Sequence, residues 1–437
     1  MPVRTVPETD LTYHLISFDA AGRERTDDPD GSKSRRAVDA LANEPFTDVF
    51  LISHGWKGDV PSAIAQYDAW IATMIRATAD LGRMRQARPG FRPLIVGLHW
   101  PSLPWGDEAV GGAAAFAAGA AGSVEALIDQ YAERIADTPA ARQALETIFA
   151  AAMDEIAPPT LPPEVREAYT VLNREAGLGS AGVGAAPGDD REPFDPEAAY
   201  QAAEEEEAAS FGSFSLGGLL APLQQLSFWK MKDRARTFGE SGGFALLGDL
   251  QRAGPDARFH LMGHSFGCIV VSAILDGPDG RGALVRPVDS LVLVQGALSH
   301  WSYCSDIPPA PGVAGYFHSI VADRKVRGPI ITTQTEFDTA VGRFYPLGAG
   351  VAGQVAFAPG ELPKYGALGT FGVRGPGADP VDLEMLPADA PYGFEPGKVY
   401  NLECSHVIRE GGGASGAHGD FLRPEVAHAV WEAAQIS

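Results

Sequence analysis

Residues 258–272 contain a serine whose neighbours could make it a nucleophile. Ser265 is the central residue of Gly263-His264-Ser265-Phe266-Gly267, a G-x-S-x-G motif. A serine hydroxyl is a weak nucleophile near neutral pH unless a base takes its proton and donors stabilise the oxyanion that forms. The motif needs a sharp turn between a strand and a helix. Whether this serine can be a nucleophile therefore depends on the secondary structure of the segments on either side.

The segments that flank Ser265 have the required character. Residues 259–262 form a short apolar run that predicts a buried strand, and residues 268–275 are small and apolar, as in a buried helix. Side chains at Gly263 and Gly267 would collide where strand and helix meet. The helix would also point its N–H groups at a negative charge near the serine. Although a bare motif is common in a chain with 51 glycines, this context favours a nucleophile.

A base and an acid that could serve Ser265 occur later in the chain. Asp338 follows an apolar run at residues 329–335, and His418 precedes the last predicted helix. Open α/β sheets carry their sites on the loops at the carboxyl ends of the strands. We therefore expect Asp338 and His418 to lie at the same edge of the sheet as Ser265.

Both partners have alternatives. Asp338 could instead cap a helix that begins at Thr339, which is a common role for aspartate. Glu336 and Asp306 remain candidate acids, and His406, close behind the last predicted strand, is the second candidate for the base.

Buried strands that alternate with helices are predicted on both sides of the middle of the chain. This alternation indicates an α/β fold with a mostly parallel central sheet flanked by helices. The predicted strands lie at residues 11–18, 48–53, 93–99, 259–262, 290–295, 329–335 and 398–404, and the predicted helices include residues 61–79 and 425–435.

The middle of the chain differs in composition. Residues 111–122 are rich in alanine and glycine, residues 123–156 and 164–175 have helical patterns, and residues 177–196 have the composition of a mobile loop. Residues 154–207 hold fourteen acids and three arginines, a net charge of −11 out of −22 for the whole chain. We therefore expect an inserted, mainly helical acidic cap at residues 105–225, between two parts of a core at residues 1–104 and 226–437.

These features together resemble the α/β-hydrolase superfamily. The matching residues are the motif around Ser265, the loop His54-Gly55-Trp56 after an early strand, Asp338 after a late strand, and His418. Their order of serine, acid and histidine is that of the family. The resemblance covers residues 45–104 and 226–437, and it implies an α/β-hydrolase fold with Ser265, Asp338 and His418 as the catalytic residues.

The resemblance also implies an oxyanion hole. In this family one donor is the N–H that follows the nucleophile, here Phe266, and the other comes from the loop after the early strand, here Trp56. Candidate lining residues of a substrate pocket, which could equally belong to the core, are His54, Gly55, His264, Trp100 and Trp105.

Composition limits the partners. A net charge of −22 and a pI of about 4.8 disfavour nucleic acids and stable association with anionic membranes. The three cysteines, the acidic runs and the glycines show no disulfide framework, metal-ligand spacing or nucleotide loop, so we expect no metal or cofactor. Without an apolar leader or a spanning segment, the expected location is the cytoplasm.

The leading hypothesis is a serine hydrolase that cleaves small-molecule carboxylic esters through an acyl-enzyme. Lipase, thioesterase and peptidase activities use the same groups and remain open. A second hypothesis is a non-catalytic α/β-hydrolase-like protein that binds a ligand or partner. A third is a lipase that touches lipid through residues 109–122 and 216–226.

Overall fold

The computed structural model describes residues 3–26, 31–56, 60–102, 124–153, 158–209, 218–342, 362–412 and 415–436. These residues fall into two compact units. The first unit takes in the described residues up to Ser102, from Arg234 to Gly342, and from Leu362 onward, and the second takes in those from Val124 to Asp233.

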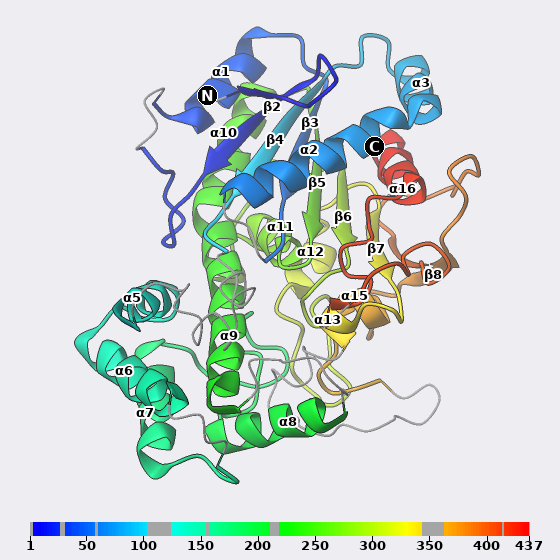
Figure 1. Ribbon diagram of the computed structural model, residues 1–437. Coiled ribbons are helices and arrows are strands. Elements are labelled where there is room, and N and C mark those ends of the chain that lie inside the picture. The colour runs from blue at the N-terminus through cyan, green and yellow to red at the C-terminus, as the bar shows by residue number, and fades with distance from the viewer. Residues whose placement is uncertain are drawn as a thin grey trace. The chain divides into compact units, whose positions relative to one another are not determined.

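A nine-stranded sheet lies in the first unit (Figure 1). Its order is β1-β2-β4-β3-β5-β6-β7-β9-β8, and every neighbouring pair is parallel except β1 and β2. The mostly parallel α/β architecture expected from the sequence is therefore confirmed. The strands are β1 (Val3–Thr5), β2 (Thr12–Ser17), β3 (Asp48–Ser53), β4 (Pro93–His99), β5 (Arg258–His264), β6 (Ser290–Val294), β7 (Ile330–Gln334), β8 (Val381–Glu384) and β9 (Val399–Glu403).

Helices cover both faces of this sheet (Figure 1). One face carries α2 (Val60–Arg76), α3 (Thr78–Ala87) and α16 (Pro424–Gln435), and the other carries α1 (Lys33–Asn43), α10 (Phe244–Ala253), α11 (Gly267–Asp276) and α12 (His318–Ala322). Short elements complete the unit: the π-helix η3 (Gly239–Gly243), η4 (Pro278–Gly280), α13 (Thr339–Gly342) and α15 (Leu368–Phe371).

The alternation of side chains along a strand explains why both faces are apolar. Phe50 and Ile52 of β3 join the core under α2 and α16, which also contains Trp70 and Trp431. Val49 and Leu51 are equally buried but are not members of that cluster. Successive residues of a strand point to opposite faces. When helices cover both sides, the middle of a strand such as β3 is therefore apolar at every position.

The second unit is helical in its described residues. It contains α5 (Val124–Arg134), α6 (Pro139–Met153), α7 (Pro163–Glu175), α8 (Pro196–Ala209), η2 (Gly218–Leu220) and the first part of α9 (Ala221–Phe238). Its own apolar core includes Ile148, Tyr169, Leu223 and Leu226. The described part of the apolar stretch at residues 216–226 is therefore packed inside this unit, and residues 109–122 lie outside the described residues.

The boundaries of this unit differ in detail from the sequence expectation. One helical pattern over residues 123–156 becomes α5 and α6, because Thr138 Oγ1 accepts the N–H of Ala141 at 3.1 Å and starts a new helix just before Pro139. The division between the units falls between Asp233 and Arg234, inside the unbroken helix α9, and not at residue 225.

The loop-like segment at residues 177–196 is tied to the second unit by buried charges. Asp190 and Arg191 are buried, and Lys232 Nζ lies 2.6 Å from Asp190 Oδ2. Arg191 donates to the side chain of Asn173 at 2.7 Å. The structure thus gives this glycine-rich and acidic segment fixed contacts, where its composition indicates a mobile loop.

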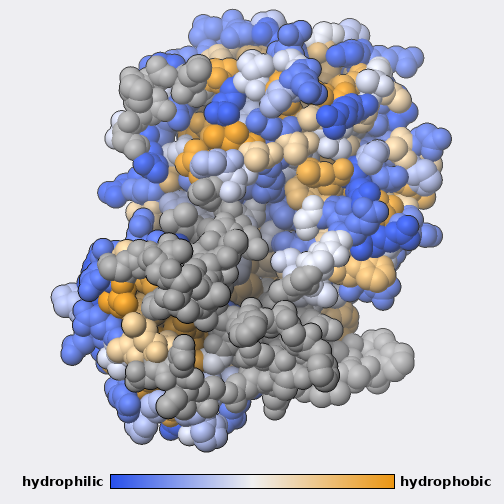
Figure 2. Space-filling model, in the orientation of Figure 1, coloured by the Kyte–Doolittle hydropathy of each residue, from blue (hydrophilic) through white to orange (hydrophobic). Residues whose placement is uncertain are grey.

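On the face of the first unit drawn in Figure 2, apolar residues are interspersed with polar ones. Among the described residues, no helix combines the length and the hydropathy that crossing a membrane requires.

Candidate active site

Ser265 occupies the sharp turn between β5 and α11. Its φ is +57°, a left-handed conformation that a residue with a Cβ adopts only at a cost of about 1–2 kcal/mol. The turn is held by the end of β6, because Ser265 N donates to Val294 O at 3.0 Å and Ser265 O accepts from Ala297 N at 3.2 Å. Strain of this kind is typical of functional sites.

The two glycines of the motif are required by close packing. A Cβ on Gly263 would collide with the carbonyl group of Gly267, and a Cβ on Gly267 would collide with the carbonyl oxygen of Ser53 in β3. The sequence therefore needs glycine at both positions to let β5 turn directly into α11.

Asp338 lies four residues beyond β7 and has two structural contacts of different kinds. Its Oδ1 accepts the N–H of Val341 at 3.2 Å, which caps α13 as the alternative interpretation suggested. Its Oδ2 lies 2.7 Å from His418 Nδ1. Capping the helix and holding the histidine are therefore compatible roles.

His418 is brought to Asp338 by its own loop. The neighbouring Ala417 N donates to Phe337 O at 2.9 Å, so the two loops are joined through their backbones as well as their side chains. Because Nδ1 faces a carboxylate, the proton of the neutral ring is held on Nδ1 and the lone pair is left on Nε2. That is the tautomer a general base requires.

Ser265 and His418 share one region of the sheet edge. The ring of His264, directly before the serine, lies 4.9 Å from the ring of His418 between centroids. Among the contacts of the described residues, however, Ser265 Oγ and His418 do not form a hydrogen bond. Catalytic hydrogen bonds often tighten only when substrate is bound.

The alternative acids and base lie elsewhere. Glu336 and Asp306 are exposed, and Asp306 accepts the N–H of Gly312 at 2.6 Å. His406 is exposed too, with Nδ1 3.7 Å from a carboxylate oxygen of Glu384. The structure joins His418 with Asp338 and does not join either of them with these three side chains.

The loop after β3 runs directly against Ser265. A Cβ placed on Gly55 would lie 2.6 Å from Ser265 Cβ, so only glycine fits there. The rings of Trp56 and Phe266 stack at 5.6 Å between centroids. The two residues predicted to donate to the oxyanion thus contact each other beside Ser265, and Phe266 is the N-terminal cap of α11.

Two of the candidate pocket residues are wholly buried. His54 and Trp100 are inaccessible to solvent, and their rings stack at 5.6 Å with an angle of 3°. Trp100 Nε1 also donates to His54 O at 3.3 Å. His54 and Trp100 therefore belong to the core that supports the loop, in agreement with the core interpretation. Trp105 lies outside the described residues.

His264 links the strand to the predicted base. Its Nε2 donates to the carbonyl oxygen of His418 at 3.0 Å, its Nδ1 accepts from Gln66 Nε2 at 3.1 Å, and its ring stacks on Phe421 at 4.1 Å. Burial, and to a smaller extent the charge that His418 carries when it is protonated, holds the pKa of His264 well below its ordinary value. His264 is therefore neutral and is not a proton carrier at pH 7.

Sequence reasoning missed Gln66, Phe421 and Gln295. Gln295 follows β6 and donates through Nε2 to Asp338 Oδ2 at 2.9 Å. The available signal was position alone, since Gln295 is a polar residue at the carboxyl end of a buried strand. Nothing in the sequence marks Gln66 or Phe421 in that way.

Cys268, three residues after Ser265, is buried within α11. Burial raises the pKa of the Cys268 thiol well above its ordinary value, and Sγ lies 3.2 Å from Gly263 O. Cys268 is thus an unreactive packing residue.

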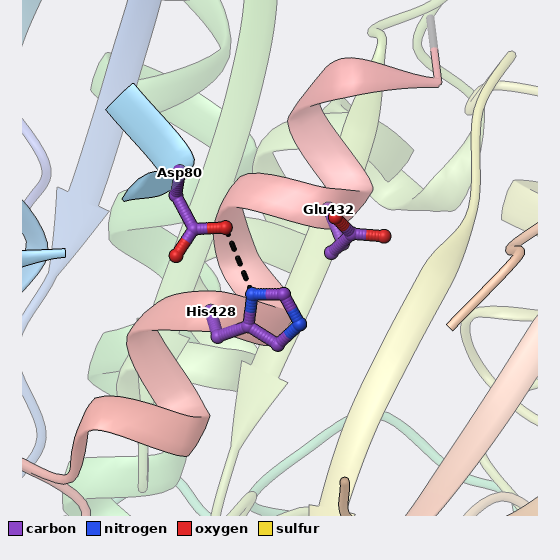
Figure 3. A group of neighbouring side chains, drawn as sticks. All are labelled: Asp80, His428 and Glu432. Carbon is purple, nitrogen blue, oxygen red and sulfur yellow. Dashed lines mark hydrogen bonds and ion pairs between the residues drawn. The ribbon is translucent and has the colours of Figure 1, made fainter. Parts of the chain in front are cut away.

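Three potential metal ligands gather in a different part of the first unit. Asp80 of α3 and His428 and Glu432 of α16 bring one ligand atom each within 4.8 Å of one another (Figure 3). Both nitrogens of His428 already face acceptors, Asp80 Oδ1 at 2.8 Å and Ala390 O at 2.9 Å. Arg83 contacts the Asp80 carboxylate and lies 3.7 Å from Glu432.

The guanidinium of Arg83 therefore supplies the positive charge that a metal would otherwise bring to this cluster. We interpret it as an ion-pair network that fastens α3 to α16, the helix that follows the His418 loop.

No family model matches this chain, and comparison with curated proteins and with solved structures yields no significant match. The functional argument therefore depends on the geometry of the site.

Proposed function

We propose that this chain is a serine hydrolase of the α/β-hydrolase type that cleaves carboxylic esters through an acyl-enzyme. The observation that carries the proposal is the 2.7 Å contact between His418 Nδ1 and Asp338 Oδ2 at the sheet edge where Ser265 has a left-handed backbone. The order of the three residues and their positions after β5, β7 and β9 support it, because this family uses that order.

In the proposed reaction Ser265 Oγ attacks the ester carbonyl while His418 Nε2 takes its proton. The backbone N–H groups of Phe266 and Trp56 stabilise the oxyanion. His418 then gives the proton to the departing alcohol. A water molecule, deprotonated by His418, hydrolyses the acyl-enzyme and regenerates the serine, while Asp338 stabilises the transient imidazolium.

The proposed nucleophile is tested with a fluorophosphonate, which labels an activated serine. We expect one adduct, located on Ser265 by mass spectrometry, and none in Ser265→Ala. Folded protein that takes up no label at Ser265 would remove the catalytic proposal and favour the non-catalytic binding protein.

The proposed base is tested by a matched pair of substitutions. His418→Ala should lower kcat for an activated ester by about 10³-fold or more, whereas His406→Ala, on an exposed side chain, should change it less than twofold. Equal losses in the two variants would contradict the assignment. Rates across a series of acyl-chain lengths, in solution and in emulsion, separate an esterase from a lipase.

A further inference from the structure

Gln295 is a buried residue that contacts the carboxylate of Asp338. Its Nε2 donates to Asp338 Oδ2 at 2.9 Å, the same oxygen that accepts from His418 Nδ1. Val341 N donates to the other oxygen. The carboxylate therefore receives three donors from three segments of the chain.

The direction of the Gln295 amide is fixed by Thr333 in β7. Thr333 Oγ1 lies 2.7 Å from Gln295 Oε1, and the same hydroxyl accepts Gln295 N at 2.9 Å. The single hydroxyl proton is thus donated to Oε1, and this orients the Nε2 end of the amide toward Asp338.

This arrangement is buried and strained. Gln295 is inaccessible to solvent, Thr333 and Asp338 are each 1% exposed, and Gln295 has a φ of +47°. A left-handed backbone at a residue with a Cβ opposes folding, and a buried amide is tolerated only where it is hydrogen-bonded. An apolar side chain in ordinary geometry would be the cheaper solution if Gln295 only filled space.

We propose that Gln295 is a positioning residue that holds the Asp338 carboxylate in the orientation in which Oδ2 faces His418. The terminal torsion of an aspartate is broad and has no strong preference of its own, so donors must set it. Gln295 fixes Oδ2 and Val341 fixes Oδ1, and His418 then meets a carboxylate that does not need to rotate as the imidazolium forms. This inference rests on the proposed function.

The test is a double-mutant cycle between Gln295→Met and Asp338→Ala. Methionine has a similar length to glutamine but cannot donate. Gln295→Met should lower kcat for an activated aryl ester by about 10- to 100-fold, the range for one lost hydrogen bond to a charged group, with KM little changed. In the Asp338→Ala background the same substitution should change kcat less than twofold, because it acts only through Asp338.

Two further variants guard against a loss of structure. Thr333→Val removes the group that orients the amide and should lower kcat in the same direction by a smaller factor, again only while Asp338 is present. Gln251→Met is the matched control, since Gln251 is buried in α10 and bonded to Arg286 O; it should leave kcat unchanged. Thermal midpoints identify any variant that unfolds.

A Gln295→Glu variant supplies a pH-dependent readout, which a purely structural role of Gln295 would not produce. A glutamic acid can donate to Asp338 only while it is protonated, so the activity of this variant relative to wild type should rise as the pH falls from 8 to 5.5.

Two outcomes would overturn the inference. One is a wild-type kcat in Gln295→Met, and the other is a loss of kcat on Gln295→Met that is equally large with Asp338 and with Ala at position 338. If Gln295→Met fails to fold, the same comparison of kcat with and without Asp338 is made for Thr333→Val. If wild-type Ser265 takes no fluorophosphonate, the proposed function itself has failed. If it is labelled and the cycle is additive, only the role of Gln295 is wrong.

Discussion

The carboxylate of Asp338 serves two neighbours with its two oxygens. One caps α13 and the other meets His418. Consequently a substitution at Asp338 disturbs the cap of α13 as well as the contact with His418. The resulting loss of kcat would overstate the electrostatic effect of Asp338 on the proposed base. The cycle with Gln295 avoids this difficulty, because it compares the same substitution with and without Asp338.

Residues of the first unit also set a pH limit on stability. Burial lowers the pKa of His54 and of His300 to about 3, and lowers that of His264 as well. An unfolded histidine takes its proton near pH 6.5. Between about pH 6.5 and pH 3 the unfolded chain therefore binds more protons, and stability falls as the pH falls.

We predict that the free energy of unfolding drops by on the order of 1–2 kcal/mol per buried histidine between pH 6.5 and pH 5. His300→Asn, which can still donate to Gly366 O as Nδ1 does, should reduce the slope by about one proton. Urea titrations at several pH values measure both slopes. Comparing slopes cancels other groups, such as Glu240, whose pKa is raised by burial. An unchanged slope would show that His300 titrates normally in the folded state.

At the scale of elements, the junction of β5 and α11 depends on the absence of side chains. A Cβ on Gly267 would meet main-chain atoms of β3, which cannot move without disturbing the sheet. We predict that Gly267→Ala lowers the free energy of unfolding by about 1–3 kcal/mol or more, measured by chemical denaturation.

Gly82→Ala is the matched control for that substitution. Gly82 lies inside α3 with open space around the position of a Cβ, so alanine there should stabilise the protein by about 0.5–1 kcal/mol. If both variants were equally destabilised, a general intolerance of glycine replacement, and not close packing at the elbow, would be the cause.

The strands were the most predictable elements because the sheet is covered on both faces. Continuous apolar runs such as residues 49–52 indicate a buried element, and their short length indicates a strand. Positions after strands then located Ser265, Asp338 and His418. The same rule could have found Gln295, but its amide becomes informative only when Thr333 and Asp338 are seen on either side.

Contacts between distant polar residues were not predictable. Asp190 reads as part of an acidic, solvated segment, yet it is buried against Lys232. A single sequence shows the charge of each residue but not which of the many oppositely charged residues lies next to it. The division of α9 between the two units was not predictable either, because its sequence continues as one helix across the boundary.

At the scale of the whole molecule, two units with separate apolar cores should not unfold as one. Burial lowers the pKa of Lys232 to about 8 despite its contact with Asp190, which shows how strongly this pair is removed from water. Replacing Lys232 by methionine would remove the ammonium that lies 2.6 Å from the buried Asp190 carboxylate.

We therefore predict that Lys232→Met destabilises the second unit by about 3–5 kcal/mol and leaves the unfolding of the first unit in place. Calorimetry should show one transition lowered and one retained, while fluorophosphonate labelling of Ser265 survives up to the retained transition. Lys230→Met, whose ammonium is partly exposed, should have a much smaller effect. A single transition shifted as a whole would contradict the independence of the two cores.

The pairing of β3 with β5 has a consequence for biosynthesis. Asp48 of β3 lies opposite Arg258 of β5, so the ribosome adds 210 residues between one partner and the other. At a synthesis rate of about 5–20 residues per second, roughly 10–40 s pass between the synthesis of β3 and that of its partner strand β5. During that interval β3, whose four central residues are apolar, has an open edge, which is a template for aggregation. The elbow that carries Ser265 can form only after this interval, because β5 is part of it.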